Sequence, residues 1–263
     1  MHSFDELILQ TRDVLHARDA CGSAFSTAEH TLPIPPLDEL PIPVGPHVGR
    51  GIVLRANTAV ELGGTTNDSC ALVLATSDTS LVRDGYVSLF GPDIAQLRSS
   101  DSAETAVHTP FAQIIFVAGE NLAPDDFSAL EQCQRAKDYI DGYLVRSFTG
   151  QVHSRVSRQL ADRGFTFAML ASALSHIVKQ ACPAAQRVEV AFATEPDRVQ
   201  RCIPVRDAWI ASSHDLRKAR WLEKGIDIDC PAGGHCGSCA DKATCDRVRA
   251  IARMRKERQA VHA

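Results

Sequence analysis

Four cysteines lie within sixteen consecutive residues near the end of the chain. They are Cys230, Cys236, Cys239 and Cys245, and their spacing is C-x5-C-x2-C-x5-C. Thiolates are soft metal ligands, and four of them complete either a tetrahedral zinc site or a cubane iron–sulfur cluster. The segment is therefore expected to bind one metal centre through these four side chains.

The spacing and the glycine content of this segment favour iron–sulfur over zinc. A four-cysteine zinc site usually has two C-x2-C pairs, and only Cys236 and Cys239 form such a pair. Gly233, Gly234 and Gly237 lie between the cysteines, and glycine lets backbone N–H groups approach cluster sulfurs. We expect a 4Fe-4S cluster, with zinc as the alternative and with redox-active or unliganded thiols as a third reading.

Composition excludes several classes of partner. The 263 residues are 44% hydrophobic and 23% charged, with a net charge of −4, so no strong positive field favours nucleic acid or an anionic membrane. The apolar run at Ile114–Ala118 is too short to cross a bilayer. Asp5, Glu6 and Arg12 interrupt any apolar core of a secretion signal. We expect a cytoplasmic location, where thiols stay reduced.

The spacing of apolar residues predicts the helices and strands that must position the metal-binding segment. Together these elements indicate an α+β fold. Mixed strands are expected in the N-terminal half, helices packed on them, and a C-terminal Cys-rich metal-binding segment. The expected strands are 70–75, 85–90, 111–118 and 187–193. The expected helices are 3–19, one from Pro124 towards Phe148, one capped by Thr166 and ended by Pro183, and one from Pro196 to Leu222 with an interruption near Pro204.

Three parts of the chain are expected. Residues 1–46 hold the first helix, expected to be an appendage to the main body, and a proline-rich arm. Residues 47–222 form an α+β domain, and residues 223–263 form the four-cysteine segment and a basic C-terminal helix. That helix is either a solvated tail or a docking face for an acidic partner. The five scattered cysteines are expected to be small buried hydrophobic side chains; they are Cys21, Cys70, Cys133, Cys182 and Cys202.

Several short motifs recur in an order that one family shares. They are Val60-Glu-Leu-Gly-Gly64, Leu72-Val73, Arg83-Asp-Gly-Tyr-Val87, Gly91-Pro-Asp-Ile94, Val117-Ala-Gly-Glu120, a helix expected at Tyr139–Phe148, and Val205-Arg-Asp-Ala208 before the cysteines. Over roughly residues 44–245 this order resembles the beta subunit of the carbon monoxide dehydrogenase/acetyl-CoA synthase complex. The resemblance covers the family's middle region and the start of its metal domain.

The resemblance implies a role in one-carbon or acyl-group metabolism within a larger complex. The family assembles acetyl-CoA from carbon monoxide, a corrinoid-borne methyl group and coenzyme A, at a cubane joined to two nickel ions. The four cysteines would correspond by position to the cubane ligands. Other protein subunits, such as a corrinoid or dehydrogenase protein, would be partners. Whether this chain catalyses a reaction alone is left open.

A coenzyme A site is also implied, because the family's arginine-rich middle domain is associated with that ligand. The corresponding residues here are Arg206, Arg217 and Arg220, whose guanidinium groups suit phosphate. An ordinary solvated helix surface is the alternative. The chain lacks the Cys-Gly-Cys tripeptide that holds the family's outer nickel, since Cys236 and Cys239 are separated by two residues. A shortened and divergent relative is therefore expected, and a nickel centre stays open.

Overall fold

The computed structural model describes most of the chain up to the end of its last long helix. The described residues are 4–17, 29–49, 51–98, 106–136, 138–223, 239, 242–247, 249–250 and 254. They fall into two compact units, Met1–Ile210 and Ala211–Ala263. Among the described residues, no helix combines the length and the apolar character needed to cross a membrane.

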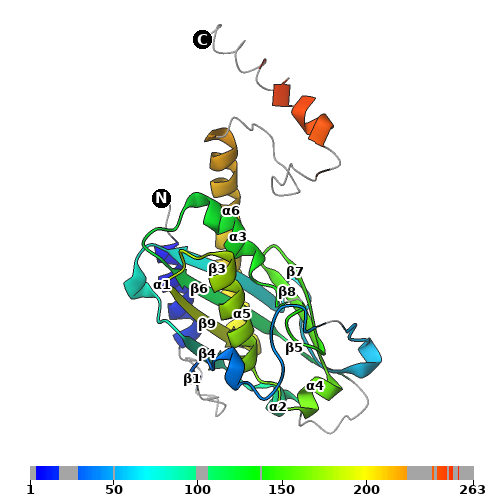
Figure 1. Ribbon diagram of the computed structural model, residues 1–263. Coiled ribbons are helices and arrows are strands. Elements are labelled where there is room, and N and C mark those ends of the chain that lie inside the picture. The colour runs from blue at the N-terminus through cyan, green and yellow to red at the C-terminus, as the bar shows by residue number, and fades with distance from the viewer. Residues whose placement is uncertain are drawn as a thin grey trace. The chain divides into compact units, whose positions relative to one another are not determined.

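A five-stranded mixed sheet forms the centre of the first unit (Figure 1). Its strand order is β1 (Glu29–Pro33), β4 (Tyr86–Phe90), β9 (Arg187–Ala193), β6 (Phe111–Ala118) and β3 (Ser69–Thr76). β3 pairs parallel with β6, and β4 pairs parallel with β9, whereas β6 and β9 run antiparallel. β3 and β6 are buried along their whole lengths, as continuous apolar runs require.

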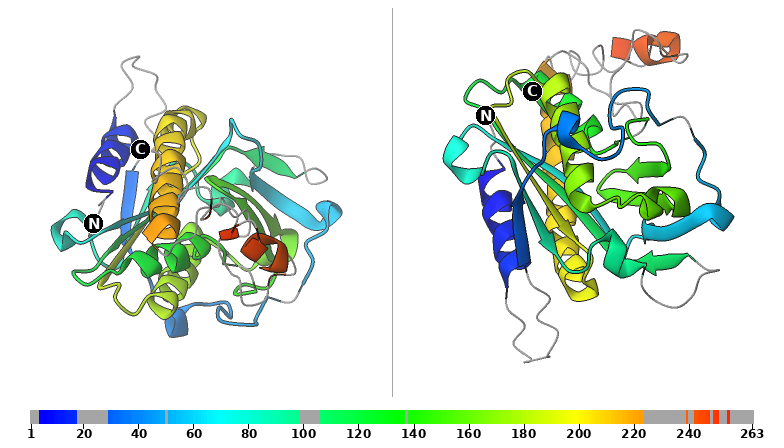
Figure 2. Two further views of the ribbon diagram at one scale, coloured as in Figure 1. Left: turned by 90° about the horizontal axis from the view of Figure 1, so that it is seen from above. Right: turned by 60° about the horizontal axis from the view of Figure 1, so that its bottom comes forward.

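Helices cover both faces of this sheet. α5 (Phe167–Ala181) packs on one face together with α3 (Pro124–Gln132). Val188, Val190 and Phe192 of β9 point into the core on that side. α1 (Asp5–His16) and the first part of α6 (Pro196–Glu223) lie against the opposite face, where Arg198 sits over the ring of Phe90. Figure 2 shows this layered arrangement from two further directions.

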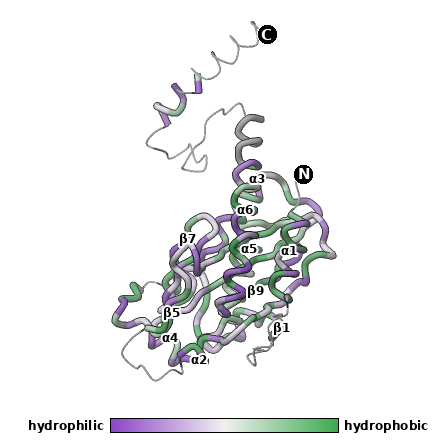
Figure 3. The backbone as a smooth tube through the Cα atoms, turned by 180° about the vertical axis from the view of Figure 1, so that it is seen from behind, coloured by the Kyte–Doolittle hydropathy of each residue, from purple (hydrophilic) through white to green (hydrophobic). Residues whose placement is uncertain are grey.

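A second, four-stranded sheet closes the core beside β3. Its order is β5 (Val107–Thr109), β2 (Thr58–Gly63), β8 (Gln151–Ser157) and β7 (Tyr143–Phe148). Along β8, Val152, Ser154 and Val156 are buried, and the residues between them are partly exposed. One face of this sheet therefore belongs to the core, and the face that carries Glu61, His153 and Arg155 points away from it. Figure 3 shows long hydrophobic stretches through the middle of the unit.

Short helical segments connect these strands. They are α2 (Ile94–Leu97), α4 (Arg158–Asp162), and the 3-10 turns η1 (Leu37–Glu39), η2 (Arg55–Asn57) and η3 (Thr79–Leu81). Asp93 caps α2, and Ser157 caps α4 by accepting a hydrogen bond from the N–H of Leu160. These caps satisfy the backbone donors that a helix start leaves unpaired.

The N-terminal helix is an integral part of the first unit rather than an appendage to it. Phe4 and Ile8 are buried, and α1 packs against β3. The hydroxyl of Thr76 in β3 donates a hydrogen bond to the carboxylate of Asp5. The proline-rich arm is also partly docked, because the hydroxyl of Ser172 in α5 donates to the carbonyl of Pro35 over 2.6 Å. The expected boundaries at residues 46/47 and 222/223 stay predictions.

The α+β class, with helices packed on mixed sheets, is confirmed, and several elements match their predicted ranges. β6 and β9 coincide with the predicted strands, and β3 and β4 differ only at their ends. Thr166 caps α5, accepting a hydrogen bond from the N–H of Met169. The C-terminal Cys-rich segment lies largely outside the described residues, so that part of the fold prediction is not tested.

The helix predicted to continue to Phe148 was wrong. α3 ends at Gln132, and residues 143–148 form strand β7. Asp138 has φ 63° and Gly142 has φ 83°, and two left-handed residues so close together cannot continue a right-handed helix. Tyr143 and Val145 are buried, and they alternate with the partly exposed Leu144 and the exposed Arg146, so both can face the core from a strand.

The predicted interruption near Pro204 was also wrong. Pro204 lies inside α6, which runs without a break from Pro196 to Glu223. Proline removes one intrahelical hydrogen bond but does not forbid a helix that is held by packing on both sides of it. Cys202 and Trp209 are both buried against the sheet, and they supply that packing.

Candidate functional site

The predicted metal-binding segment is only partly described. Cys239 and Cys245 are free thiols with intermediate exposure, whereas Cys230 and Cys236 lie outside the described residues. Residues 242–247 are helical, and the N–H of Lys242 donates to the carbonyl of Cys239. Cys239 and Cys245 are therefore linked by a short described helical stretch. Two accessible soft donors fit the predicted centre. Among the described residues, no three metal-binding side chains gather.

Arg206, one of the predicted coenzyme A ligands, is 3% exposed and binds protein groups. Its Nη1 donates to the carbonyls of Thr66 and Ser69, over 2.5 and 2.9 Å. Its Nε and Nη2 donate to one carboxylate oxygen of Asp207, over 3.0 and 2.8 Å. The guanidinium therefore fastens α6 to the turn between β2 and β3. A role in ligand binding stays a prediction.

Arg217 and Arg220 belong to α6, but their side chains are outside the described part of the structure. Trp209, also on α6, is 2% exposed, and its indole N–H donates to the carbonyl of Val73 over 2.9 Å. It is therefore a core residue of the first unit and does not offer a face to an adenine ring.

The β2–β3 turn, residues 63–68, is held from several sides. Gly63 has φ +61°, and a Cβ there would lie 2.4 Å from the carbonyl of Val152. The Ser69 hydroxyl donates to that same carbonyl and accepts from the N–H of Val152, each over 2.7 Å. Gly64 runs directly over the ring of His153, so that a Cβ would meet it at 3.3 Å. The two glycines of the Val60–Gly64 motif are thus required for close approach.

A cluster of charged and polar side chains lies on the outward face of the four-stranded sheet, beside this turn. The carboxylate of Glu61 bonds His153 Nε2 at 2.7 Å and Arg155 Nε at 3.0 Å. Burial acts to raise the pKa of Glu61, but the hydrogen bonds from His153 and Arg155 outweigh it and hold the pKa below its usual value. The cluster is thus a carboxylate shared by an imidazole and a guanidinium.

A second imidazole–carboxylate pair flanks the turn. His108 Nε2 lies 2.9 Å from the carboxylate of Asp68. Burial tends to raise the pKa of Asp68, but hydrogen bonds from His108 and Thr65 lower it overall. Two imidazoles oriented by carboxylates can bind an anion or transfer a proton. Glu61 and Gly63–Gly64 were recognised in the sequence only as parts of a motif, and the two histidines were not singled out.

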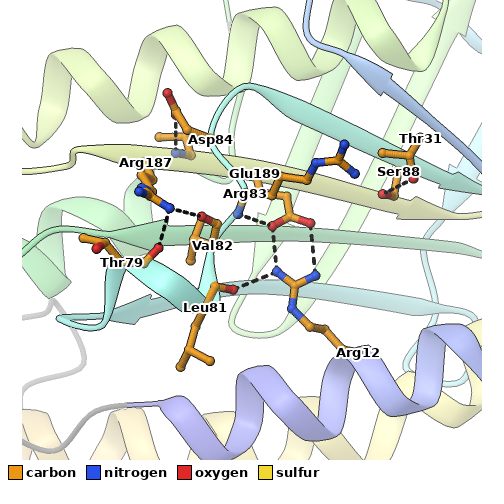
Figure 4. A network of polar contacts seen from close by, with 11 residues as sticks. Arg12, Thr31, Thr79, Leu81, Val82, Arg83, Asp84, Ser88, Arg187 and Glu189 are labelled. Atoms are coloured by element: carbon orange, nitrogen blue, oxygen red, sulfur yellow. Dashed lines mark hydrogen bonds and ion pairs between the residues drawn. The ribbon is translucent and has the colours of Figure 1, made fainter.

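The opposite side of the molecule contains an ion pair that sequence reasoning missed. Arg12 of α1 binds both carboxylate oxygens of Glu189 in β9, at 3.1 and 2.6 Å (Figure 4). Glu189 is 4% exposed and also accepts the backbone N–H of Arg83, while Arg12 donates to the carbonyl of Leu81. The available signal was a glutamate within the apolar run of β9. All partners come from the protein itself, so this network is structural.

One open pocket of about 460 Å³ lies at the other end of the four-stranded sheet. It is lined by Gly51, Ile52, Val53, Asn57, Asp141, Gly142, Ser157, Arg158 and Gln159. Ile52, one of these lining residues, is 81% exposed. Its lining mixes small, amide and charged side chains that share no one chemical character. The pocket therefore does not indicate a specific ligand.

Four of the five scattered cysteines are buried, as predicted, and Cys21 lies outside the described residues. The thiol of Cys70 in β3 lies 3.7 Å from the carbonyl of Cys202 in α6, and the neighbouring Cys202 and burial raise its pKa. Burial, with a smaller contribution from Cys182, raises the pKa of Cys133 to about 12. Such thiols are protonated and inert at neutral pH, so they are poor candidates for metal ligands.

Comparison with protein families gives one match that covers most of the first unit. The family described as "CO dehydrogenase/acetyl-CoA synthase complex beta subunit" matches residues 40–199. The matched range contains both sheets except β1, together with α3 and α5. It ends before the cysteine segment.

Individual relatives agree with this family. The chain is 30% identical over 194 residues to the acetyl-CoA decarbonylase/synthase complex subunit beta of Methanothermobacter thermautotrophicus, covering 73% of this chain and 40% of the relative. It is 25% identical over 191 residues to the subunit of that name from Archaeoglobus fulgidus, covering 72% and 35%. A subunit beta 2 from Methanosarcina mazei is 27% identical over 188 residues, covering 68% and 38%. The matched part thus spans well under half the length of these relatives.

Proposed function

Because the chain belongs to the CO dehydrogenase/acetyl-CoA synthase complex beta subunit family, we propose that it is an iron–sulfur member of that family. It acts in one-carbon or acyl-group metabolism, where C–C or C–S bonds are made or broken, within a larger complex in the cytoplasm. One observation carries the proposal. A unit of this family, matched over residues 40–199, is followed by four cysteines within sixteen residues.

The cluster is proposed to be held by Cys230, Cys236, Cys239 and Cys245. Cys239 and Cys245 are accessible thiols, whereas the buried Cys70 and Cys133 have raised pKa values and do not supply thiolates. A 4Fe-4S cluster, when bound, supplies one-electron transfer. Zinc at the same four positions would give a stabilised scaffold without redox chemistry, and the test below distinguishes the two metals.

Coenzyme A is the proposed small-molecule ligand, and α6 carries its proposed contacts. Arg206 already donates four hydrogen bonds to Thr66, Ser69 and Asp207. Any phosphate contact therefore falls mainly on Arg217 and Arg220, which are neighbours on a helix at i, i+3. A guanidinium gives two parallel hydrogen bonds to a phosphate, which makes arginine suitable for this task.

The proposed partners are other subunits of the complex, among them a corrinoid or dehydrogenase protein. The relatives carry the name of a complex subunit, and the chain covers 35–40% of the length of the relatives described above. Catalysis by the isolated chain is not part of the proposal.

Cysteine substitution tests the proposal directly. Cys236→Ser and Cys239→Ser, purified without oxygen, are expected to lose most of the bound iron, because a serine oxygen is a harder and poorer ligand. Cys133→Ser is the matched control and should keep it, since Cys133 lies in the core of the first unit. Circular dichroism checks the fold of each variant. Equal iron loss in all three would show that the ligands are assigned wrongly.

A further inference from the structure

The outward face of the four-stranded sheet presents its side chains in rows, which the strand register defines. Residues paired across β7, β8, β2 and β5 stand side by side on this face. The first row is Leu144, Arg155, Glu61 and His108; the second is Arg146, His153 and Gly63; the third is Phe148 and Gln151. The helices of the core pack against the other face of this sheet.

The carboxylates at this face are already bound by other side chains: Asp68 contacts His108 of the first row at 2.9 Å. Glu61, in the first row, carries a carboxylate that is bound by His153 and Arg155. Arg146 is exposed, and within the described part of the chain it takes part in no ion pair. Its neighbour across the sheet is His153, whose ring is bound to Glu61. A partner approaching β7 therefore meets a guanidinium that no carboxylate of the described residues pairs with.

An apolar anchor stands next to this charge. Phe148, two residues along β7 from Arg146, is 67% exposed. Leu144, two residues in the other direction, is partly exposed on the same face. Exposed aromatic side chains next to arginine are the residue types enriched at the centres of protein–protein interfaces. Leu144, Arg146 and Phe148 together form a line of apolar, basic and aromatic groups along β7, which we call the β7 stripe.

We propose that the β7 stripe is a docking site for an acidic segment of another polypeptide. A carboxylate of the partner pairs with Arg146, and an apolar side chain packs on Phe148. This inference rests on the proposed function, since it identifies the chemistry of a partner within the complex. Nucleic acid fits the face less well, because a phosphate backbone needs a sustained positive field, whereas this face contains Glu61 and the chain has a net charge of −4.

The experiment measures the binding of a fluorescein-labelled peptide, rich in Asp and Glu with one central leucine, by fluorescence anisotropy at low salt. Arg146→Glu should weaken binding by about tenfold or more, because an attractive pair becomes a repulsive one. Phe148→Ser should weaken it while leaving its salt dependence unchanged. Arg163→Glu is the matched control: Arg163 is exposed at the end of α4, and its reversal should leave the affinity of the peptide within about twofold.

The inference fails if wild-type protein does not bind the peptide, or if Arg146→Glu and Phe148→Ser bind it as tightly as wild type does. The second result would assign binding to other basic residues, such as those at the C-terminus. It also fails if a single-stranded oligonucleotide binds as tightly as the peptide and responds to the same variants. Iron content is measured on the same preparations. Iron-loaded protein without peptide binding contradicts only this inference, and peptide binding without iron contradicts only the proposed function.

Discussion

Arg12 and Glu189, 177 residues apart in sequence, form an ion pair with two hydrogen bonds that joins α1 to the central sheet. The guanidinium of Arg12 also lies over the ring of Phe116 at 4.9 Å. Glu189 is buried in a strand between two others, and among the described residues its carboxylate is bound by Arg12 and by the N–H of Arg83. The first helix is therefore part of the first compact unit, Met1–Ile210.

Removing Arg12 should destabilise the protein, because a buried carboxylate then loses its counter-charge. We expect Arg12→Ala to lower the free energy of unfolding by about 2–3 kcal/mol, somewhat less than for a fully buried pair because Arg12 is partly exposed. The double variant Arg12→Met/Glu189→Met should recover much of that loss. Urea denaturation followed by circular dichroism measures both variants. A single variant as stable as wild type would show that α1 is held by its apolar contacts alone.

Stability should fall in acid, partly because the pKa of Glu61 is lowered in the folded state. A carboxyl whose pKa is lower when folded contributes stability above its unfolded pKa, near 4.3, and loses that contribution as pH falls through the folded value. Glu61→Gln should therefore be less stable than wild type at pH 7, and the gap should close below about pH 4. Free energies of unfolding of both proteins, measured from pH 7 to below about pH 4, show whether the difference between them shrinks in acid. A gap that widens in acid would contradict the assignment.

Arg206 should matter for stability whether or not it binds a ligand. Arg206→Ala would leave the carbonyls of Thr66 and Ser69 without their donor, and we expect a loss of about 2–4 kcal/mol. Amide hydrogen exchange should become faster in residues 66–70, the segment that contains the two carbonyls bound by Arg206. Unchanged stability and exchange, combined with weaker coenzyme A binding, would instead make Arg206 a ligand residue.

Coenzyme A binding provides a separate test of α6. If Arg217 and Arg220 hold a phosphate, calorimetry at low salt should show binding in the micromolar range, because charge-assisted bonds of about 1.5–3 kcal/mol each are offset by ordering of the side chains. Arg217→Ala/Arg220→Ala should abolish most of it, and added salt should weaken it. Arg163→Ala serves as the control. No binding of coenzyme A or of an acyl-CoA would remove this ligand from the proposal.

Much of the central sheet was predictable from local pattern. Phe111–Ala118 is a continuous apolar run, and it forms β6 with the predicted ends. Arg187–Ala193 alternates, and it forms β9. Thr166 has the side chain that an N-cap needs. Each of these signals is local. A helix or strand that buries one face must repeat its apolar residues at a fixed spacing, and that spacing can be seen within the element's own sequence.

The remaining features depend on partners distant in sequence. β7 was mistaken for helix, since Ile140, Tyr143 and Leu144 also fit helical spacing and the positive φ of Asp138 has no sequence signature. Arg206 looks like a surface residue of a basic helix until the β2–β3 turn is placed against it. The cluster of Glu61 and His153 forms only when β2 pairs with β8, 92 residues away.

Metal analysis of the protein purified without oxygen tests the central claim most directly. Cys230, Cys236, Cys239 and Cys245 should hold a single cubane, so iron should be present at about four atoms per chain, with acid-labile sulfide in equal amount. The protein should be brown, and reduction with dithionite should bleach it. Stoichiometric zinc without iron, under the same anaerobic handling, would contradict the account.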